Sequence, residues 1–156
     1  MLKRTVLAVA LGVALAAAGV AAAAAVTHQG SASSSATAGR VTLHQTKIGK
    51  VLATSSGRTL YLFMKDKNGR SACYGQCASY WPPLMKKGTL RAGAGVKASL
   101  LGTTKRKNGK RQVTYKGHPL YYFVQDKKAG DTKGQDVNGF GAQWYVVAPS
   151  GKKIGD

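Results

Sequence analysis

The feature that most constrains the fold is an internal duplication with an offset of sixty residues. The segment Gly57–Lys67 aligns with Gly117–Lys127, and six of the eleven positions are identical. In repeat proteins each copy forms one supersecondary unit, which buries its apolar face against its neighbour. We therefore predict two repeats, at about 48–84 and 108–147, that pack together as a single domain.

The duplication extends beyond the aligned segment in both directions. Upstream, Thr54 matches Thr114 at the same offset. Downstream, Trp81 matches Trp144 after the offset has grown by three residues. Matching tryptophans at the far end of each copy indicate that the repeats share a whole folding unit and not a short motif alone.

Local patterns predict a mostly β structure. Apolar residues occupy both faces of Arg58–Lys65, which is typical of a strand covered on both sides. Asn108-Gly109 lies between two extended runs and predicts a hairpin, because both residues tolerate positive φ angles. We also expect a short helix near Ala72–Tyr80, ended by Pro82-Pro83, and a closing strand at Gln143–Val147. The predicted fold is one small antiparallel β domain.

The N-terminal segment has the pattern of an export signal. Lys3 and Arg4 precede an alanine-rich apolar run that reaches Val26. We therefore predict that residues 1–26 are a secretory signal peptide. The alternative is a retained membrane anchor, because the run is long enough to cross a bilayer. No cysteine follows the run, so we expect no lipid attachment there.

Residues 27–40 predict a flexible linker. Its stretch Ser31–Gly39 has no large apolar side chain whose burial would offset the entropy lost on ordering. The β-rich domain is expected over residues 41–156, a length that suits one domain.

One motif, Y-x-[FWY]-x-x-D, occurs once in each repeat, as Tyr61-x-Phe63-x-x-Asp66 and Tyr121-x-Phe123-x-x-Asp126. Together with Cys73-x-x-x-Cys77 and Trp81-Pro82-Pro83-Leu84, it resembles a bacterial family known as secreted repeats of unknown function, mostly predicted lipoproteins. The resemblance covers nearly all of Val51–Gly151. It implies secretion but no established activity, and the missing lipidation cysteine favours free secretion.

The two motif aspartates are expected to be structural. Asp66 opens the sequence Asp66-Lys67-Asn68-Gly69, which fits a turn whose first side chain accepts backbone N–H groups. Asp126 opens the matching turn of the second repeat. The alternative is a pair of cation-binding or catalytic carboxylates, as a hydrolase would need.

The motif aromatics Tyr61, Phe63, Tyr121 and Phe123 are expected in the core. Paired aromatic residues in strands pack together, with each tyrosine hydroxyl hydrogen-bonded at an edge. The alternative is an aromatic groove that stacks sugars or a flat cofactor.

Cys73 and Cys77 leave three interpretations open. An oxidising environment outside the cell favours a disulfide, and one helical turn brings the two Cα atoms within range. Two thiolates on one helical face also suit a soft metal such as Cu(I). A strained, exposed pair would suit redox exchange. We expect the disulfide and no cofactor, with copper binding as the alternative.

The charge is the clearest physical feature. It is +19 for the whole chain and +17 without Lys3 and Arg4, which generates a strong positive field. Five cations gather at the predicted hairpin tip: Lys105, Arg106, Lys107, Lys110 and Arg111. We expect anionic cell-wall polymers or a membrane surface as partners. Sequence-specific nucleic-acid binding is not expected, because no recognition motif is present, and no obligate protein partner is evident.

The sequence thus predicts a secreted, non-enzymatic protein of the cell envelope, extracellular or wall-associated, whose basic surface binds polyanions. It contains no glycine-rich phosphate loop, and its histidines suggest no catalytic triad. The alternative function is metal or redox handling centred on Cys73 and Cys77.

Overall fold

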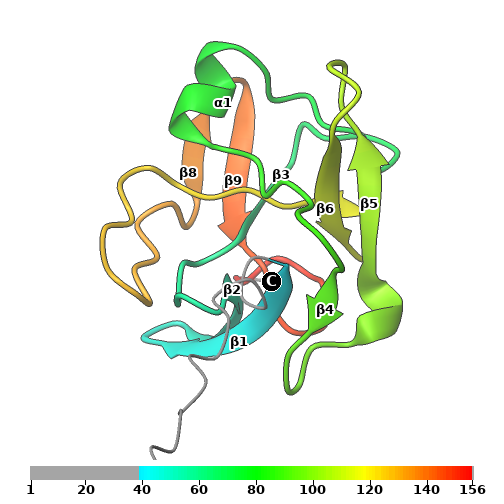
Figure 1. Ribbon diagram of the computed structural model, residues 1–156. Helices are drawn as coiled ribbons and strands as arrows, with labels where there is room; N and C mark the ends of the chain where they lie inside the picture. Colours follow the sequence, from blue (N-terminus) through cyan, green and yellow to red (C-terminus); the bar gives the residue numbers. More distant parts are fainter. Residues whose placement is uncertain (1–38, 156) are drawn as a thin grey trace, which may run out of the picture. The chain divides into compact units, whose positions relative to one another are not determined.

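The computed structural model describes residues 39–155 and confirms the mostly β fold. In these residues the regular structure consists of three small sheets, one short α-helix and one short 3₁₀ helix (Figure 1). The predicted signal peptide, residues 1–26, and residues 27–38 of the predicted linker lie outside the described residues. Arg40, at the end of the predicted linker, already belongs to the first strand.

Each sheet has three strands. The first sheet orders its strands β2 (Gly49–Thr54), β1 (Arg40–Thr46) and β4 (Arg91–Ala92). The second orders them β3 (Tyr61–Phe63), β9 (Ala142–Val146) and β8 (Val137–Gly139). The third orders them β5 (Leu101–Lys105), β6 (Arg111–Tyr115) and β7 (His118–Pro119). All strand pairs are antiparallel except the short pair β1–β4.

Among residues 39–155, helical structure is confined to two short elements. The helix α1 (Gln76–Tyr80) falls within the predicted helical segment, although it begins four residues later. A 3₁₀ turn, η2 (Ala98–Leu100), leads into β5. The hairpin predicted from Asn108-Gly109 joins β5 to β6, and Gly109 supplies the positive φ angle of 79° that closes it.

The two repeats exchange their closing segments. In the second sheet, Phe63 of β3 lies opposite Trp144 of β9, so the last strand of the second repeat completes a sheet begun by the first. The reciprocal contact is the 2.8 Å hydrogen bond from the Tyr122 N–H to the Pro82 carbonyl oxygen. Each copy therefore depends on the other for backbone pairing, and a single repeat would leave polar backbone groups unpaired.

The hydrogen bonds of the two copies are related by an approximate two-fold axis between Tyr61 and Tyr121. The N–H of Tyr61 donates to the carbonyl of Tyr121 at 2.9 Å, and the reverse bond measures 3.0 Å. Exchanging the repeats therefore reproduces the central contact.

The backbone pairing corrects one match between the repeats. Ala53 pairs with Thr59, and Thr114 pairs with Pro119, which is the counterpart of Thr59. Thr114 therefore corresponds to Ala53, and its predicted match with Thr54 is wrong by one residue. The turn before the motif strand is one residue longer in the first repeat than in the second.

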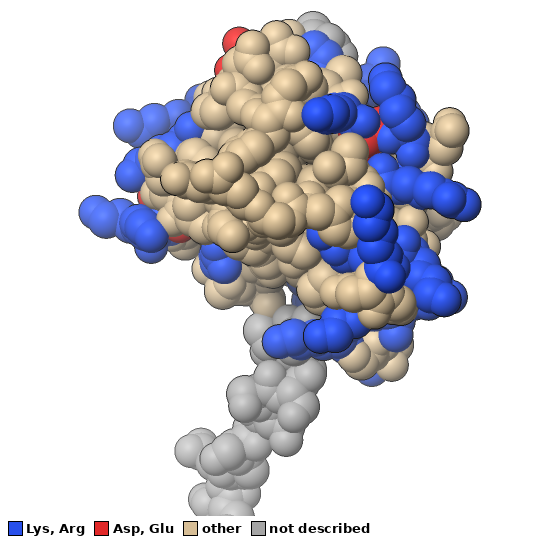
Figure 2. Space-filling model, turned by 90° about the horizontal axis from the view of Figure 1, so that it is seen from above, with Lys and Arg blue, Asp and Glu red and all other residues tan. Residues whose placement is uncertain are grey.

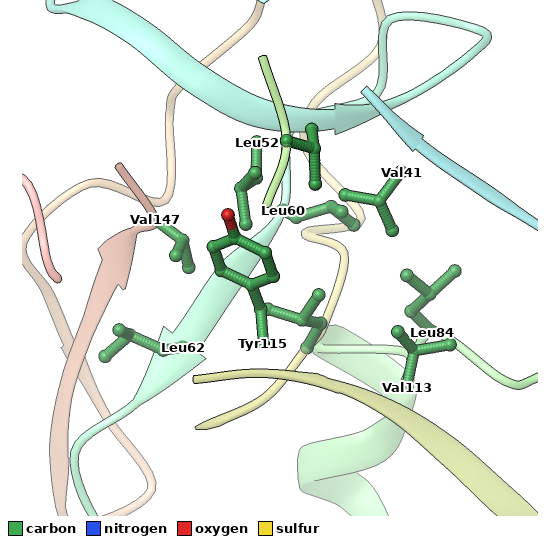
Figure 3. Close-up of a cluster of buried hydrophobic side chains, with 10 residues drawn as sticks. Val41, Leu52, Leu60, Leu62, Leu84, Val113, Tyr115 and Val147 are labelled. Atoms are coloured by element: carbon green, nitrogen blue, oxygen red, sulfur yellow. The ribbon is translucent and has the colours of Figure 1, made fainter. Parts of the chain in front are cut away.

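Strand β3 and the residue before it separate two apolar clusters. Leu60 and Leu62 face the first cluster, in which Tyr115 lies centrally (Figure 3). Tyr61 and Phe63 face the second. Burial on both faces agrees with the apolar pattern. Met64 differs: it continues the alternation but is 41% exposed, because β3 ends at Phe63 and the chain turns there.

A stack of four aromatic rings crosses the centre of the second cluster. Its ring centroids are separated by 3.9 Å, 4.0 Å and 4.2 Å in the order Phe63, Trp144, Trp81, Phe123. The two tryptophans meet at the middle, and each outer ring is a motif phenylalanine. The stack therefore joins the repeats face to face, and both tryptophans are fully buried.

Replacing Trp81 by Ala should lower the free energy of unfolding by about 3–5 kcal/mol, because the change opens a cavity in the middle of this stack. The matched control is Tyr80→Ala, one residue earlier, where the ring is 46% exposed and the loss should stay below about 1 kcal/mol. Urea unfolding followed by far-UV circular dichroism measures both values. Equal losses would contradict a central role for the stack.

Candidate functional site

The motif tyrosine of each repeat bonds the motif aspartate of the other repeat. The hydroxyl of Tyr61 donates to Asp126 Oδ2 at 2.6 Å. The hydroxyl of Tyr121 donates to Asp66 Oδ2 at 2.8 Å. The tyrosine and the aspartate of each Y-x-[FWY]-x-x-D motif thus find their hydrogen-bond partners in the other copy, across the two-fold axis.

The second oxygen of each aspartate holds a loop. Asp66 Oδ1 accepts the Ala72 N–H at 2.7 Å, and Asp126 Oδ1 accepts the Lys133 N–H at 3.0 Å. The turn predicted at each aspartate would supply an N–H donor about two residues later, but the observed donors come six and seven residues later. The carboxylates therefore order longer loops than a simple turn would contain.

Burial dominates the electrostatics of these pairs. Desolvation raises the pKa of Asp66 to about 6, against the opposing effect of its hydrogen bonds from Ala72 and Tyr121. Desolvation likewise raises the pKa of Asp126. The phenol pKa values of Tyr61 and Tyr121 are raised by burial and by the adjacent carboxylates, so both hydroxyls remain donors.

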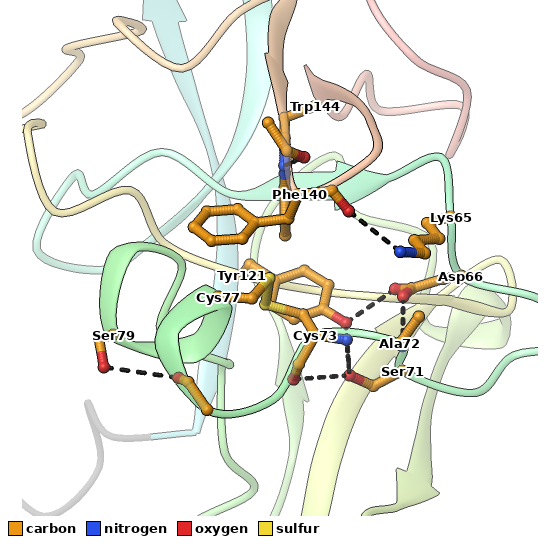
Figure 4. The surroundings of a disulfide bond; sticks show 12 residues. Lys65, Asp66, Ser71, Ala72, Cys73, Cys77, Ser79, Tyr121, Phe140 and Trp144 are labelled. Carbon is orange, nitrogen blue, oxygen red and sulfur yellow. Dashed lines mark hydrogen bonds between the residues drawn. A yellow bond between two sulfur atoms is a disulfide. The ribbon is translucent and has the colours of Figure 1, made fainter.

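Cys73 and Cys77 form a disulfide with a Cα–Cα distance of 5.2 Å. The bond joins the loop after Asp66 to helix α1, and Figure 4 shows it beside the ring of Tyr121. Both cysteines are buried. Copper binding would need two free thiolates, and here both sulfurs are bonded to each other. Among residues 39–155, no group of three or more His, Cys, Asp or Glu side chains is placed to hold a metal ion.

The prediction that five exposed cations gather at the hairpin tip is wrong for Arg106. It is only 6% exposed, so it is not a free surface cation. Its Nη1 donates to Ser71 Oγ at 2.9 Å and to Gln112 Oε1, and its Nη2 donates to the Cys73 carbonyl at 2.7 Å. A run rich in lysine and arginine is typical of a solvated turn, so nothing in the sequence indicated this burial.

The other four members of the cluster are exposed around the same hairpin: Lys105, Lys107, Lys110 and Arg111. The guanidinium of Arg111 already makes one hydrogen bond, because its Nη1 donates to Thr103 Oγ1 at 3.1 Å. Lys107 lies with its Nζ 4.9 Å from the centre of the Tyr74 ring. The hairpin tip therefore combines flexible lysines with one aromatic ring from the disulfide loop.

Sequence reasoning missed three residues that the structure places beside Arg106: Ser71, Tyr74 and Gln112. Gln112 carried a usable signal, since it is a polar residue in the buried strand β6, and it is fully buried. Ser71 and Tyr74 carried none, because both lie in a loop whose path depends on the Asp66–Ala72 bond.

The geometry defines a class: a β domain of two interlocked repeats, tied by crossed tyrosine–aspartate pairs. The sequence profile of a family described as secreted repeat of unknown function matches residues 42–85 and 102–148, one copy for each repeat. The chain therefore belongs to this family, which confirms the resemblance carried by the motif. Searches among curated proteins and among solved structures gave no significant match. Over residues 39–155, no helix is both long and apolar enough to cross a bilayer.

A double-mutant cycle tests whether the pairing crosses between repeats. Tyr61→Phe and Asp126→Asn should each lower the free energy of unfolding by about 1–3 kcal/mol, with a coupling energy of about 1–2 kcal/mol. The control cycle joins Tyr61→Phe to Asp66→Asn, which belong to one repeat and should couple by less than about 0.5 kcal/mol. Stronger coupling within the repeat than across it would refute the crossed arrangement.

The raised pKa of Asp66 predicts an unusual pH dependence. Between its ordinary value of 3.8 and about 6, the unfolded chain has released this proton while the folded chain retains it. Ionisation then opposes folding, so the Asp66 contribution to stability falls as pH rises through this window, by about 1–2 kcal/mol after solvent screening. Asp66→Asn keeps an acceptor for the Ala72 N–H but cannot titrate.

Urea unfolding of wild type and Asp66→Asn at intervals from about pH 4 to pH 7 measures this effect. The stability difference between the two proteins should shift in favour of the variant as pH rises. If the free energies of unfolding of the two proteins changed in parallel with pH, Asp66 would have the same pKa in the folded and unfolded states, and the prediction would be wrong.

Proposed function

We propose that this protein is a secreted, non-enzymatic component of the cell envelope that binds anionic surface polymers through its basic side chains. The family description supports secretion. The observation that carries the binding proposal is the charge balance, because 24 Lys and Arg residues face only 5 acids. Two of those acids, Asp66 and Asp126, are engaged by tyrosines and backbone N–H groups. The acids are therefore too few to pair with most of the cations.

The distribution of the charge also favours a polymeric partner. Figure 2 shows basic side chains around much of the rim of one face, with few acidic atoms among them. Exposed lysines recur on separate hairpins and loops, at Lys47, Lys87, Lys107, Lys110 and Lys128. Scattered point charges on flexible stems suit a long polyanion, whose repeated charges engage many lysines and release counterions.

Retention on cell-wall fragments tests this proposal. The full chain should bind fragments that carry their anionic polymers, lose at least tenfold in affinity between roughly 50 and 200 mM salt, and ignore fragments stripped of those polymers. Lys107→Glu with Lys110→Glu should weaken binding by about tenfold, because the two changes reverse charge at the densest cluster.

The matched control is Lys127→Glu with Lys128→Glu, which makes the same change in net charge at a different exposed loop and should weaken binding less. Salt-independent retention, or equal binding to stripped fragments, would refute the proposal. Preferential binding to vesicles of anionic lipid over wall polymer would assign the membrane surface instead.

A further inference from the structure

A surface pocket of about 450 Å³ opens between the disulfide loop and the β5–β6 hairpin. The residues that matter here come from both repeats: Arg70, Ser71, Tyr74, Lys105, Arg106 and Lys107. Four of these six side chains are cationic, and none of the described residues that line the pocket is acidic. We propose that this pocket is a discrete binding site for a phosphate-type oxyanion, with Arg106 as its central ligand. It deepens, and rests on, the polyanion binding proposed above.

Arg106 is held rigidly in place. Its guanidinium is fixed by Ser71, Gln112 and the Cys73 carbonyl, and it lies 4.4 Å from the centre of the Tyr74 ring. The three hydrogen bonds use both Nη1 hydrogens and one on Nη2. The second Nη2 hydrogen and the Nε–H remain for a ligand. Because the side chain is already ordered, binding an oxyanion would lose little further entropy.

The duplication shows that the fold does not require this buried cation. In the register of the two hairpins, β1–β2 and β5–β6, Arg106 corresponds to Thr46 and Gln112 to Val51. In the first repeat the position of Gln112 is therefore filled by Val51, which is fully buried, and the position of Arg106 by Thr46, which is half-buried and uncharged. A buried arginine–glutamine pair is no more stabilising than such packing. Its presence in one copy alone indicates a role other than folding.

The chemistry around Arg106 selects a phosphoryl group. A guanidinium presents two N–H donors in a planar fork, which matches two oxygens of a phosphate. Lys105 and Lys107, both exposed, add charges at the hairpin side of the pocket, and Arg70 adds one at the loop side. The oxygens of Asp66 accept hydrogen bonds from the Tyr121 hydroxyl and the Ala72 N–H, and its charge interacts favourably with Arg106.

The variant Arg106→Thr with Gln112→Val tests the site by transplanting the residues of the sister copy. It should fold, because Thr46 and Val51 serve the same backbone positions in the first repeat. The control Lys47→Thr removes one charge as well, from the equivalent hairpin of that repeat. Arg106→Lys keeps the charge but loses the fork, which provides a second variant should the double change impair folding.

NMR titration of the full chain with inorganic phosphate, glycerol phosphate and acetate provides the measurement. Saturable shifts should centre on residues 70–74 and 104–107, with acetate weaker than either phosphate. The transplanted variant should bind phosphate at least about tenfold more weakly, Arg106→Lys several-fold more weakly, and Lys47→Thr within about twofold of wild type. Undiminished binding by Arg106→Thr/Gln112→Val, or shifts spread over lysines elsewhere, would overturn the site.

Parallel retention on cell-wall polymer separates this site from the broader function. Loss of both phosphate binding and polymer retention in the transplanted variant supports the site and assigns it to phosphoryl groups of the polymer. Loss of phosphate binding alone supports a site for free phosphate. If the wild-type protein is retained on polymer but shows no saturable phosphate binding, the proposed phosphate site is wrong and the polymer proposal stands. Saturable phosphate binding without polymer retention leaves the pocket standing and overturns the polymer proposal.

Discussion

The crossed pairing of Tyr61 with Asp126 and of Tyr121 with Asp66 is the constraint on which the structure depends. A buried carboxylate is tolerated only when hydrogen bonds replace its lost hydration. Here one donor comes from the partner repeat and the other from the carboxylate's own loop. One oxygen of each carboxylate thus joins the two copies through a tyrosine, and the other oxygen fixes the path of the loop that follows the aspartate. The aromatic stack adds apolar contact between the copies, and the polar pairs add directional hydrogen bonds.

This arrangement explains why the two loops differ while the centre remains symmetric. The loop after Asp126 packs Gly134 so tightly against Trp81 and Tyr61 that a Cβ there would lie within 2.8 Å of both rings. The corresponding loop after Asp66 carries Cys73 and the disulfide to α1. Since each carboxylate needs only one N–H from its loop, the rest of the loop is free to vary. The first repeat's loop meets the β5–β6 hairpin at Arg106, and it is there that the copies diverge in chemistry.

Much of this fold follows from the sequence, and the limits have physical causes. The duplication is visible when the sequence is compared with itself. The alternation around Tyr61 and the Asn108-Gly109 turn are local signals, and each predicted an element that the structure contains. The exchange of closing strands was not predictable. Trp81 and Trp144 would show the same spacing whether each paired with its own repeat or with the other. The burial of Arg106 was hidden for a related reason, because two of its acceptors, Ser71 Oγ and the Cys73 carbonyl oxygen, lie in a loop 35 and 33 residues earlier in the sequence.

A comparison of the two copies also distinguishes residues that the fold requires from residues that it does not require. Two copies of one unit fold by the same contacts, so any buried polar group present in one copy and absent from the other is not required by the shared architecture. Gln112 and Arg106 meet that condition, with Val51 and Thr46 at the equivalent positions. The network around them reaches the Cys73 carbonyl and Ser71, and it therefore shares atoms with the loop that the disulfide and Asp66 hold in place. The features that the two copies share, the crossed carboxylates and stacked rings, supply a rigid frame. The features that differ between the copies place one arginine in the lining of a cationic pocket.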